Sequence, residues 1–435
     1  MERIEEIYRL FLQCGEVTTD SRRCPEGSMF IALKGANFNG NAFAAQALAA
    51  GCRYALVDEA AYADPACPAI VQVDNCLQTL QQLARFHRRK LGTRIVGVTG
   101  TNGKTTTKEL LAAVLKQKYR VLATQGNLNN AIGVPLTLLR LTEADEVAVV
   151  EMGASHPGDI RELVDIADPD YGLITNVGMA HLQGFGSLEG VIRTKGELYD
   201  YLRTRPEGAT VFLQNENPYL NEIAHGLHCL RYGQSEGLYV SGSVTGCSPF
   251  LKFRWTADGT SHEVQTHLIG AYNLDNALAA VAVGRFFAVG DEQICQALGT
   301  YEPQNNRSQL KQTAHNRLVV DAYNANPTSM RAALLNFRQM EVPRKMVILG
   351  DMKELGASSA EEHRQIVELL KTCSFDRVVL VGTEFAATCP PFPTCATVEQ
   401  VKELLHQDPP RDCYILIKGS NSMKLAQLAD CEDLC

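Results

Sequence analysis

Residues 95–111 read "IVGVTGTNGKTTTKELL", and this stretch constrains the fold more than any other part of the chain. An apolar run predicts a buried strand over 95–99, a glycine-rich turn follows, and a helical pattern begins near Lys104. A strand that leads through a glycine loop into a helix is typical of α/β proteins, in which the helix N-terminus can bind phosphate. The stretch therefore predicts an α/β domain with a phosphate-binding turn.

The turn is a variant of the phosphate-binding pattern G-x-x-x-x-G-K-[ST]. Gly103, Lys104 and Thr105 match this pattern, but Val98 stands where its first glycine belongs. Lys104 can still reach the outer phosphates of a nucleotide, and Thr105 can bind Mg²⁺. The alternative is a plain glycine turn, but lysine and threonine at the helix entry favour the phosphate site. The predicted nucleotide-binding residues of this loop are Gly100, Thr101, Asn102, Gly103, Lys104, Thr105 and Thr106.

Strand-like and helix-like stretches alternate on both sides of this loop. In the middle of the chain, "EVAVVEMG" (146–153) and "YGLITNVG" (171–178) run to polar ends, as in a parallel sheet with its chemistry at the carboxyl ends of the strands. Helices are predicted over 76–91 and 273–287, and the basic residues 87–90 are expected to be solvated. The last segment repeats strand and helix, which predicts a third, Rossmann-like domain. We expect domains over residues 1–91, 92–303 and 304–435.

Composition narrows the classes of function. The 435 residues carry a formal net charge of −8, with 45% hydrophobic and 21% charged residues, as in soluble globular proteins. This acidic balance argues against binding to nucleic acid. The sequence contains no run of 18 apolar residues, so we expect no insertion into a membrane. The start "MERIEEIYRLF" lacks a signal-peptide pattern. The 14 cysteines include no C-x-x-C pair, so we expect reduced thiols and a cytoplasmic location. We also expect a monomer.

Three ionisable residues outside the loop are candidates for the same site. Glu151 ends an apolar strand, where a Mg²⁺-binding carboxylate is expected, although a solvated strand-end acid is the alternative. His181 lies in a glycine-rich loop and is equally compatible with an ordinary loop histidine. Residues 194–197, "TKGE", come close to the guanine-reading [NT]-K-x-D motif of GTPases, but Glu197 replaces the aspartate and the segment has a helical pattern. On such a helix Lys195 would ordinarily be a solvated charge.

Motifs spread over most of the chain resemble the Mur ligases of peptidoglycan synthesis, and within that family the members that add D-alanyl-D-alanine. The resemblance implies three domains: an N-terminal UDP-substrate α/β domain, a central P-loop ATPase domain with a parallel sheet, and a C-terminal Rossmann-like domain. The motifs are "GTNGKTTTKE", "NLNNAIGVPLTLL", "EMGASHPGDI", "TNVGMAHLQGFGS", "TKGEL", "GAYNLDNALAA", "DAYNANPTSMRAAL", "LGDMKELG" and "IKGSNSM".

The resemblance implies an ATP-dependent amide ligase. The γ-phosphate would be transferred to the terminal carboxylate of UDP-N-acetylmuramoyl-tripeptide, and the amine of D-alanyl-D-alanine would attack the acyl phosphate. Two unit negative charges about 4 Å apart repel by roughly 4 kcal/mol at an effective dielectric of 20, so cations must bridge them. The resemblance assigns this role to Lys104 and two Mg²⁺ ions, with Thr105 and Glu151 at the first ion and His181 at the second.

Lys195 matches a lysine that is carbamylated in the family, so that its carbamate becomes an anionic metal ligand. Carbamylation requires a neutral amine, and the site must therefore lower the lysine pKa. For the nucleotide, the resemblance places Asn273 and Asn276 near adenine, Arg307 near the phosphates and Asp321 on the ribose. The alternatives are helix caps for the asparagines and a surface position for Arg307.

The remaining candidates concern the UDP substrate. Ser21 and Arg22 lie in "TTDSRRCPEGSMFIALKG", which resembles the uridine-site motif of the family. The family often has Asp-Gly-His where residues 39–41 read "NGN", so contacts from that loop stay open. Asn127 and Asn130 are predicted either to line the central cleft or to order a turn.

Two rival functions remain at this point. One is a sister ligase that adds a single amino acid, either another Mur ligase or a folate-polyglutamylating enzyme; the absence of a "DNPR" motif argues against the diaminopimelate-adding sister. The other is a nucleotide switch, which the near miss at 194–197 and the set of Glu151, His181 and Lys195 disfavour. The sequence leaves lysine and diaminopimelate equally open as third residue of the tripeptide.

Overall fold

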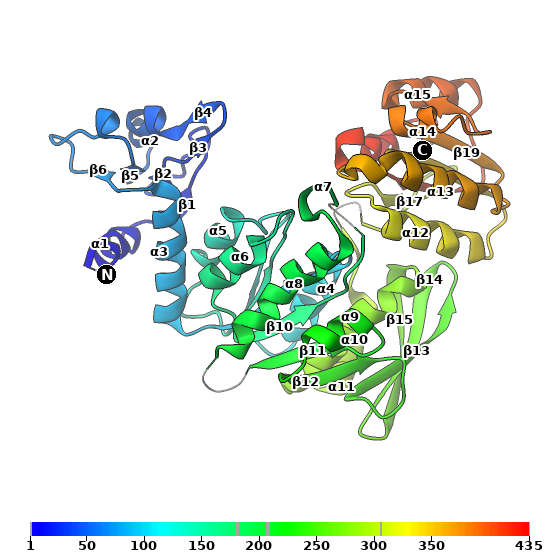
Figure 1. Cartoon of the computed structure of the whole chain (residues 1–435), viewed down its shortest axis with the longest axis horizontal. Coiled ribbons are helices and arrows are strands. Elements are labelled where there is room, and N and C mark those ends of the chain that lie inside the picture. Colours follow the sequence, from blue (N-terminus) through cyan, green and yellow to red (C-terminus); the bar gives the residue numbers. More distant parts are fainter. Residues whose placement is uncertain (1, 180–181, 206–208, 305–306, 435) are drawn as a thin grey trace.

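The structure, a computed structural model, describes residues 2–179, 182–205, 209–304 and 307–434. Three α/β units follow one another along the chain, each built on its own main sheet. The N-terminal and C-terminal units lie toward opposite ends of the long axis, with the central unit between them (Figure 1). No helix in the described ranges combines the length and the apolar character needed to cross a bilayer.

The N-terminal unit has a parallel four-stranded sheet in the order β1-β2-β5-β6 and a short antiparallel hairpin, β3-β4. Its core is apolar because Met29, Phe30 and Ile31 of the second strand are fully buried. The elements are α1 (Glu2–Phe11), β1 (Val17–Thr18), β2 (Met29–Ile31), β3 (Lys34–Gly35), β4 (Phe38–Asn39), α2 (Ala44–Ala49), β5 (Tyr54–Val57), β6 (Ile70–Gln72) and α3 (Cys76–Leu91).

The central unit has a nine-stranded sheet in the order β15-β14-β13-β12-β11-β10-β7-β9-β8. The seven strands β7 to β13 pair in parallel, and β14 and β15 extend the sheet beyond β13 in antiparallel pairing. Its strands are β7 (Arg94–Thr99), β8 (Val121–Ala123), β9 (Val147–Glu151), β10 (Tyr171–Ile174), β11 (Thr210–Gln214), β12 (His228–Gly233), β13 (Val240–Cys247), β14 (Phe250–Ala257) and β15 (Thr260–Ile269).

The helices of the central unit cover this sheet. The Ala-rich α10 packs on α4 and is buried on nearly all sides, so it forms the middle of the core rather than a surface layer. The helices are α4 (Lys104–Leu115), α5 (Gly133–Leu138), α6 (Asp159–Ala167), α7 (Leu182–Phe185), α8 (Leu188–Arg203), α9 (Pro218–Ile223), α10 (Leu274–Phe286) and α11 (Asp291–Thr300).

The C-terminal unit has a six-stranded sheet in the order β16-β17-β21-β18-β19-β20, parallel except for β16. Ile269 and Phe250 of the central unit share an apolar cluster with Phe337 and Met330 of α12, so the two units are in contact. The elements are β16 (Gln309–Gln312), β17 (Arg317–Asp321), α12 (Pro327–Gln339), β18 (Lys345–Gly350), α13 (Ser359–Lys371), β19 (Arg377–Val381), α14 (Thr383–Ala387), β20 (Thr394–Cys395), α15 (Val398–Gln407) and β21 (Tyr414–Lys418).

Helix α3 joins the first two units. It packs against α1 and also against α5 and α6, so it contacts both units, and the boundary near residue 91 stays a proposal. The expectation of a solvated basic end is wrong for part of it. Arg88 is buried, and its guanidinium lies 2.5 Å from Asp170 and 3.9 Å from Asp168 of the central unit. His87 is also buried, with Nε2 2.8 Å from the Leu141 carbonyl oxygen.

Candidate active site

The phosphate loop connects β7 to α4 at the carboxyl end of the parallel sheet. Strand β7 lies between β10 and β9, both parallel to it. Gly100 and Gly103 have φ angles of 141° and 80°, which disfavour any side chain. A Cβ at Gly103 would lie 2.5 Å from Asn276 Oδ1, and one at Gly100 would lie 2.0 Å from Thr175 Oγ1. The loop therefore needs glycine at both positions, as expected for a backbone cradle.

Lys104 begins α4 and folds back over the loop. Its ammonium donates to the carbonyl oxygens of Gly100, at 2.8 Å, and Thr101, at 3.0 Å. Burial lowers the pKa of Lys104 to about 8, although the charge of Glu151 opposes the shift; the charge of Arg307 makes a smaller contribution in the same direction as burial. Two positive groups thus share one partly desolvated space, where an anion of several charges would be stabilised.

Glu151 ends β9 with its side chain 1% exposed. Oε2 accepts a hydrogen bond from Thr105 Oγ1 at 2.9 Å, and Oε1 accepts one from Asn129 Nδ2 at 2.8 Å. The carboxylate and hydroxyl predicted to bind Mg²⁺ therefore lie side by side. Asn129 is not among the residues that the sequence predicts, although it lies in the same motif, "NLNN", as two that are.

The two predicted asparagines of that motif, Asn127 and Asn130, differ in their contacts. Asn130 Oδ1 accepts from the backbone N–H groups of Ile132, at 3.1 Å, and Gly133, at 2.8 Å, so it orders the turn before α5 while also lining the cavity described below. Asn127 is exposed and does not line that cavity. Asn130 therefore has the position expected for either alternative, whereas Asn127 lacks contact with this cavity and its role stays a prediction.

Lys195 lies on α8 with its side chain 2% exposed, rather than solvated. Burial holds the pKa of Lys195 well below its ordinary value, and the charge of Lys104 lowers it further, whereas Asp159 and Glu197 oppose the shift. Its ammonium nitrogen lies 5.5 Å from the centre of the Phe185 ring. His181 lies outside the described residues.

The GTPase-like motif has a structural explanation. Glu197 Oε1 accepts from the N–H of Gly158 at 3.0 Å, and Oε2 accepts from the N–H of Arg161 at 2.8 Å. These donors belong to the first turn of α6, so Glu197 caps a helix. The residue that stands in place of the guanine-reading aspartate therefore has no free oxygen directed at a base.

The predicted nucleotide end brings together residues from two units. Asn276 Nδ2 donates to Asn273 Oδ1 at 2.9 Å, and its Oδ1 accepts from Thr107 Oγ1 at 3.0 Å, which ties α10 to α4. The Arg307 guanidinium stacks on the Tyr323 ring at 3.9 Å from its centre. Arg307 Nε is buried and has no hydrogen-bond partner among the described residues.

Asp321 is held by two groups of the C-terminal unit. Its Oδ2 lies 2.6 Å from Lys418 Nζ, and its Oδ1 accepts from the N–H of Ser308 at 3.2 Å. Lys418 is 2% exposed and comes from the neighbouring strand β21. The sequence did not single out Lys418 or Tyr323, although each lies in a motif that carries the family resemblance, "IKGSNSM" and "DAYNANPTSMRAAL" respectively.

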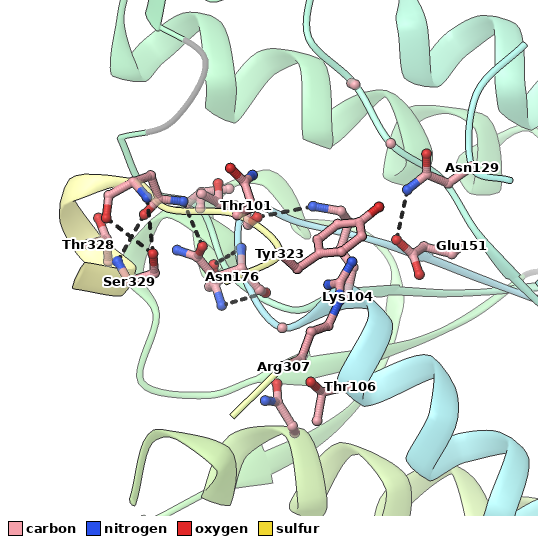
Figure 2. A pocket seen from close by; sticks show the side chains of 18 of the residues that line it. Thr101, Lys104, Thr106, Asn129, Glu151, Asn176, Arg307, Tyr323, Thr328 and Ser329 are labelled. Carbon is pink, nitrogen blue, oxygen red and sulfur yellow. Dashed lines mark hydrogen bonds between the residues drawn. The ribbon is translucent and has the colours of Figure 1, made fainter. Parts of the chain in front are cut away.

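One cavity of about 710 Å³ runs between the central and C-terminal units. Figure 2 shows Lys104, Arg307 and Tyr323 in its middle, Asn129 and Glu151 on one side, and Thr328 and Ser329 on the other. Thr105, Gly100 and Lys195 do not line it. The predicted residues that line it are Thr101, Asn102, Gly103, Lys104, Thr106, Asn130, Glu151, Asn273, Asn276, Arg307 and Asp321.

The uridine candidates lie in the N-terminal unit and do not line this cavity. Ser21 is buried, whereas Arg22 is exposed and pairs with Asp20 at 2.9 Å. In the "NGN" loop, Asn41 Nδ2 donates to Asp58 Oδ1 at 2.9 Å and to Asn39 Oδ1 at 3.0 Å. Both amide hydrogens of Asn41 are thus used within the protein, which argues against a direct donation from this side chain to a substrate.

The donor chemistry of the cavity fits a magnesium nucleotide. A hydroxyl and a carboxylate are hard oxygen ligands, and a lysine, an arginine with a free buried N–H and a helix N-terminus suit phosphates. Across the described ranges, no three His, Cys, Asp or Glu side chains converge as a complete protein cage for a metal. Mg²⁺ bound by one or two protein ligands together with substrate phosphates needs no such cage.

Family models match all three units of the chain. The Mur ligase family catalytic domain matches residues 14–88, the Mur ligase middle domain residues 98–284, and the Mur ligase glutamate ligase domain residues 306–420. A UDP-N-acetylmuramoyl-tripeptide–D-alanyl-D-alanine ligase of Bacillus subtilis (strain 168) is 38% identical over 369 residues, which cover 84% of this chain and 79% of that relative.

Solved structures agree over nearly the whole length. MurF from Acinetobacter baumannii has a TM-score of 0.87 at 30% identity and covers 98% of both chains. The MurF ligase of Thermotoga maritima, solved in complex with ADP, has a TM-score of 0.86 at 27% identity and covers 97% of this chain and 98% of its own. The α/β fold class predicted from the sequence is therefore confirmed, as is the family resemblance.

Proposed function

Because the chain belongs to the Mur ligase family, we propose that it is an ATP-dependent, ADP-forming ligase that joins D-alanyl-D-alanine to UDP-N-acetylmuramoyl-tripeptide. The names of its relatives support this choice of substrates, and the ADP complex of a similar structure supports the nucleotide. A sister activity with a single amino acid as acceptor is not favoured by these relatives. The nucleotide substrate is consistent with a cytoplasmic site of action.

One observation carries the proposal: Glu151, which accepts from Thr105, lines the same cavity as Lys104 and Arg307, and residues of two units enclose it. Thr105 and Glu151 suit a metal ion, and Lys104 and Arg307 suit the phosphates of ATP. A carboxylate substrate brought to the same cavity would face strong repulsion from the γ-phosphate. The positive groups of the cavity would offset that repulsion.

The roles of the chain's own residues follow from their positions. The loop N–H groups and Lys104 would bind the β- and γ-phosphates, and Arg307 would add charge from the C-terminal side. Thr105 and Glu151 would hold Mg²⁺, which when bound supplies positive charge between phosphate and carboxylate. Asn129 would keep the Glu151 carboxylate in one orientation. The second ion, with His181 as its ligand, stays a prediction.

Phosphoryl transfer to the carboxylate would give an acyl phosphate, from which phosphate leaves when the dipeptide amine attacks. An acyl phosphate is readily hydrolysed, so water must be excluded from the site until the amine has attacked. The position of the cavity supports this requirement, because residues of both units line it.

We also propose that Lys195 is carbamylated. The low pKa of Lys195 favours the neutral amine that reacts with CO₂, and Lys104 nearby would stabilise the resulting anion. We propose that the UDP portion binds the N-terminal unit near Ser21 and Arg22. The proposed domains span residues 1–91, 92–303 and 304–435.

Coupled phosphate release tests the proposal. The protein is supplied with ATP and Mg²⁺, a panel of UDP-muramoyl peptides, and either D-alanyl-D-alanine, single amino acids or no acceptor. We expect sustained release only with a UDP-muramoyl tripeptide and D-alanyl-D-alanine together. Turnover with single amino acids and none with the dipeptide would reject the choice of substrate. Equal ATP consumption with and without both substrates would reject a ligase.

A further inference from the structure

A side-chain contact joins the phosphate loop directly to the C-terminal unit. Asn326 Nδ2 donates to Asn102 Oδ1 at 2.7 Å, across 224 positions of sequence. Asn326 is 6% exposed, so water competes little for this bond. A buried, direct bond between a nucleotide-binding loop and a second domain transmits the position of one to the other.

On the C-terminal side, Asn326 is fixed by the start of helix α12. Its Oδ1 accepts from the N–H of Ser329 at 2.9 Å, and its own N–H donates to Ser329 Oγ at 3.1 Å. This reciprocal pair caps the helix and orients the asparagine amide. The Nδ2 group that remains is the one that contacts the loop.

On the central side, Asn102 is fixed through its backbone. Its N–H donates to Asn176 Oδ1 at 3.0 Å, and its carbonyl oxygen accepts from Thr175 Oγ1 at 2.6 Å and Asn176 Nδ2 at 3.1 Å. In Figure 2, Thr101 of the loop and Asn176 lie on the side of the cavity nearer the Thr328–Ser329 end of α12. The loop apex is thus held from β10 on one side and from α12 on the other.

We propose that Asn326 is a positioning residue, which sets the phosphate loop through Asn102 when the C-terminal unit docks on the central unit. This inference rests on the proposed function, because it concerns ATP binding at that loop. Docking of the C-terminal unit and binding of nucleotide are then thermodynamically coupled. Bound nucleotide stabilises the docked arrangement, and docking raises the affinity for nucleotide by the same factor. Asn326 itself need not touch ATP.

The test is a double-mutant cycle on nucleotide affinity. The probe is the non-hydrolysable ATP analogue adenylyl imidodiphosphate with Mg²⁺, titrated calorimetrically into the full chain. Asn326→Ser keeps a good helix cap but is too short to reach Asn102, whereas Asn326→Ala loses cap and contact together. We expect both variants to weaken binding about fivefold, the value of one neutral hydrogen bond. Only Asn326→Ala should also lower the melting temperature.

Asn102→Ala completes the cycle. If Asn326 acts through Asn102, the double variant Asn102→Ala with Asn326→Ser binds the analogue within about twofold of Asn102→Ala alone. Ser329→Ala removes only the hydroxyl contact to the Asn326 backbone and keeps the Ser329 N–H that holds Asn326 Oδ1, so its effect on affinity should be independent of that of Asn102→Ala. A residue that only stabilises α12 would show this independence too.

Two results would overturn the inference: Asn326→Ser binding the analogue as tightly as the unmodified chain, or its effect multiplying independently with that of Asn102→Ala. Failure of the unmodified chain to bind the analogue would instead count against the proposed function. The two failures are therefore distinguishable.

Discussion

Asn129 Nδ2 lies 2.8 Å from Glu151 Oε1, on the opposite side of the carboxylate from Thr105. The asparagine fixes one oxygen, the threonine hydroxyl lies at the other, and the backbone N–H of Glu151 donates to Thr124 Oγ1 at 2.9 Å. A carboxylate held in this way is oriented before any ion arrives, which is the arrangement that metal ligands commonly require.

Asn129→Ala should therefore lower kcat/KM about tenfold or more at limiting Mg²⁺, because loss of a residue that orients a metal ligand commonly lowers metal affinity or activity about 10–100-fold. The Mg²⁺ concentration that gives half-maximal rate should rise. The measurement is initial rate against Mg²⁺ concentration. Gln125→Ala, an exposed residue of the same loop, is the matched control, and equal losses in both variants would count against the orienting role.

Lys104→Met should abolish ATP turnover, by at least about a hundredfold, since it removes a preorganised positive charge from the phosphate cradle. ADP release with both substrates present measures this. Lys116→Met, exposed just beyond the other end of α4, controls for the loss of a lysine from this region. Turnover that survives in Lys104→Met would place the phosphates elsewhere.

Activity should depend on CO₂ through Lys195. The pKa of Lys195 is lowered by burial, so more of its amine is neutral at a given pH than in an ordinary lysine. As pH falls, the amine becomes protonated and the carbamate is lost. Rates in CO₂-depleted buffer should thus fall, most strongly toward acid pH, and bicarbonate should restore them.

Lys195→Ala supplies the complementary test. Its activity should be nearly absent, and formate or acetate should restore part of it by replacing the lost carboxylate. The same anions should not help Lys104→Met. Wild-type rates in Lys195→Ala would refute the carbamate.

Lys418→Met should raise the KM for ATP about tenfold, because Asp321 would lose a charged hydrogen-bond partner. If Asp321 binds ribose, the variant should also lose discrimination between ATP and its 2′- and 3′-deoxy analogues. The ratio of their KM values measures this. A raised KM with unchanged discrimination would show that Lys418 affects the site by some route other than the ribose.

Arg88→Met should lower the free energy of unfolding by about 2 kcal/mol at neutral pH, as expected for the loss of a charged hydrogen bond. Urea unfolding followed by circular dichroism measures the change. Lys90→Met, exposed on the same helix, should change it by less than about 0.5 kcal/mol. Similar losses in both would mean that the contact to Asp170 contributes little.

The network around Arg88 also has a pH signature. Burial alone would raise the pKa of Asp168, but hydrogen bonds from Arg89 and Tyr201 and the charge of Arg88 lower it to about 2. A carboxyl with a depressed pKa stabilises the folded state fully above its ordinary pKa of 3.8, and this contribution is lost as pH falls toward 2. Asp168→Asn should therefore lower the free energy of unfolding at neutral pH. Below pH 3.8 the difference in this free energy between the variant and the unmodified chain should shrink progressively.

Local patterns predicted much of this molecule. Helix α3 has the predicted bounds, 76–91, and the strands before and after the phosphate loop lie where apolar runs end in polar residues. The proximity of Thr105 and Glu151 could also be predicted, because adjacent parallel strands bring their carboxyl ends to one edge. Periodicity and strand order suffice for such features.

Contacts between distant segments could not be predicted in this way. Lys418 is 97 positions from Asp321, and Arg88 is 82 positions from Asp170, so only the folded chain reveals these pairs. Asn129 was missed for a different reason. Three asparagines stand close together in "NLNN", and which of them contacts Glu151 depends on the local turn rather than on composition.

The destination of the γ-phosphate decides the central claim, and oxygen-18 in the terminal carboxylate of the tripeptide follows it directly. If that carboxylate is phosphorylated, one labelled oxygen leaves with the phosphate, and mass spectrometry of the released phosphate should show one oxygen-18 per turnover at full labelling. Unlabelled phosphate, released while the amide product forms, would contradict the account.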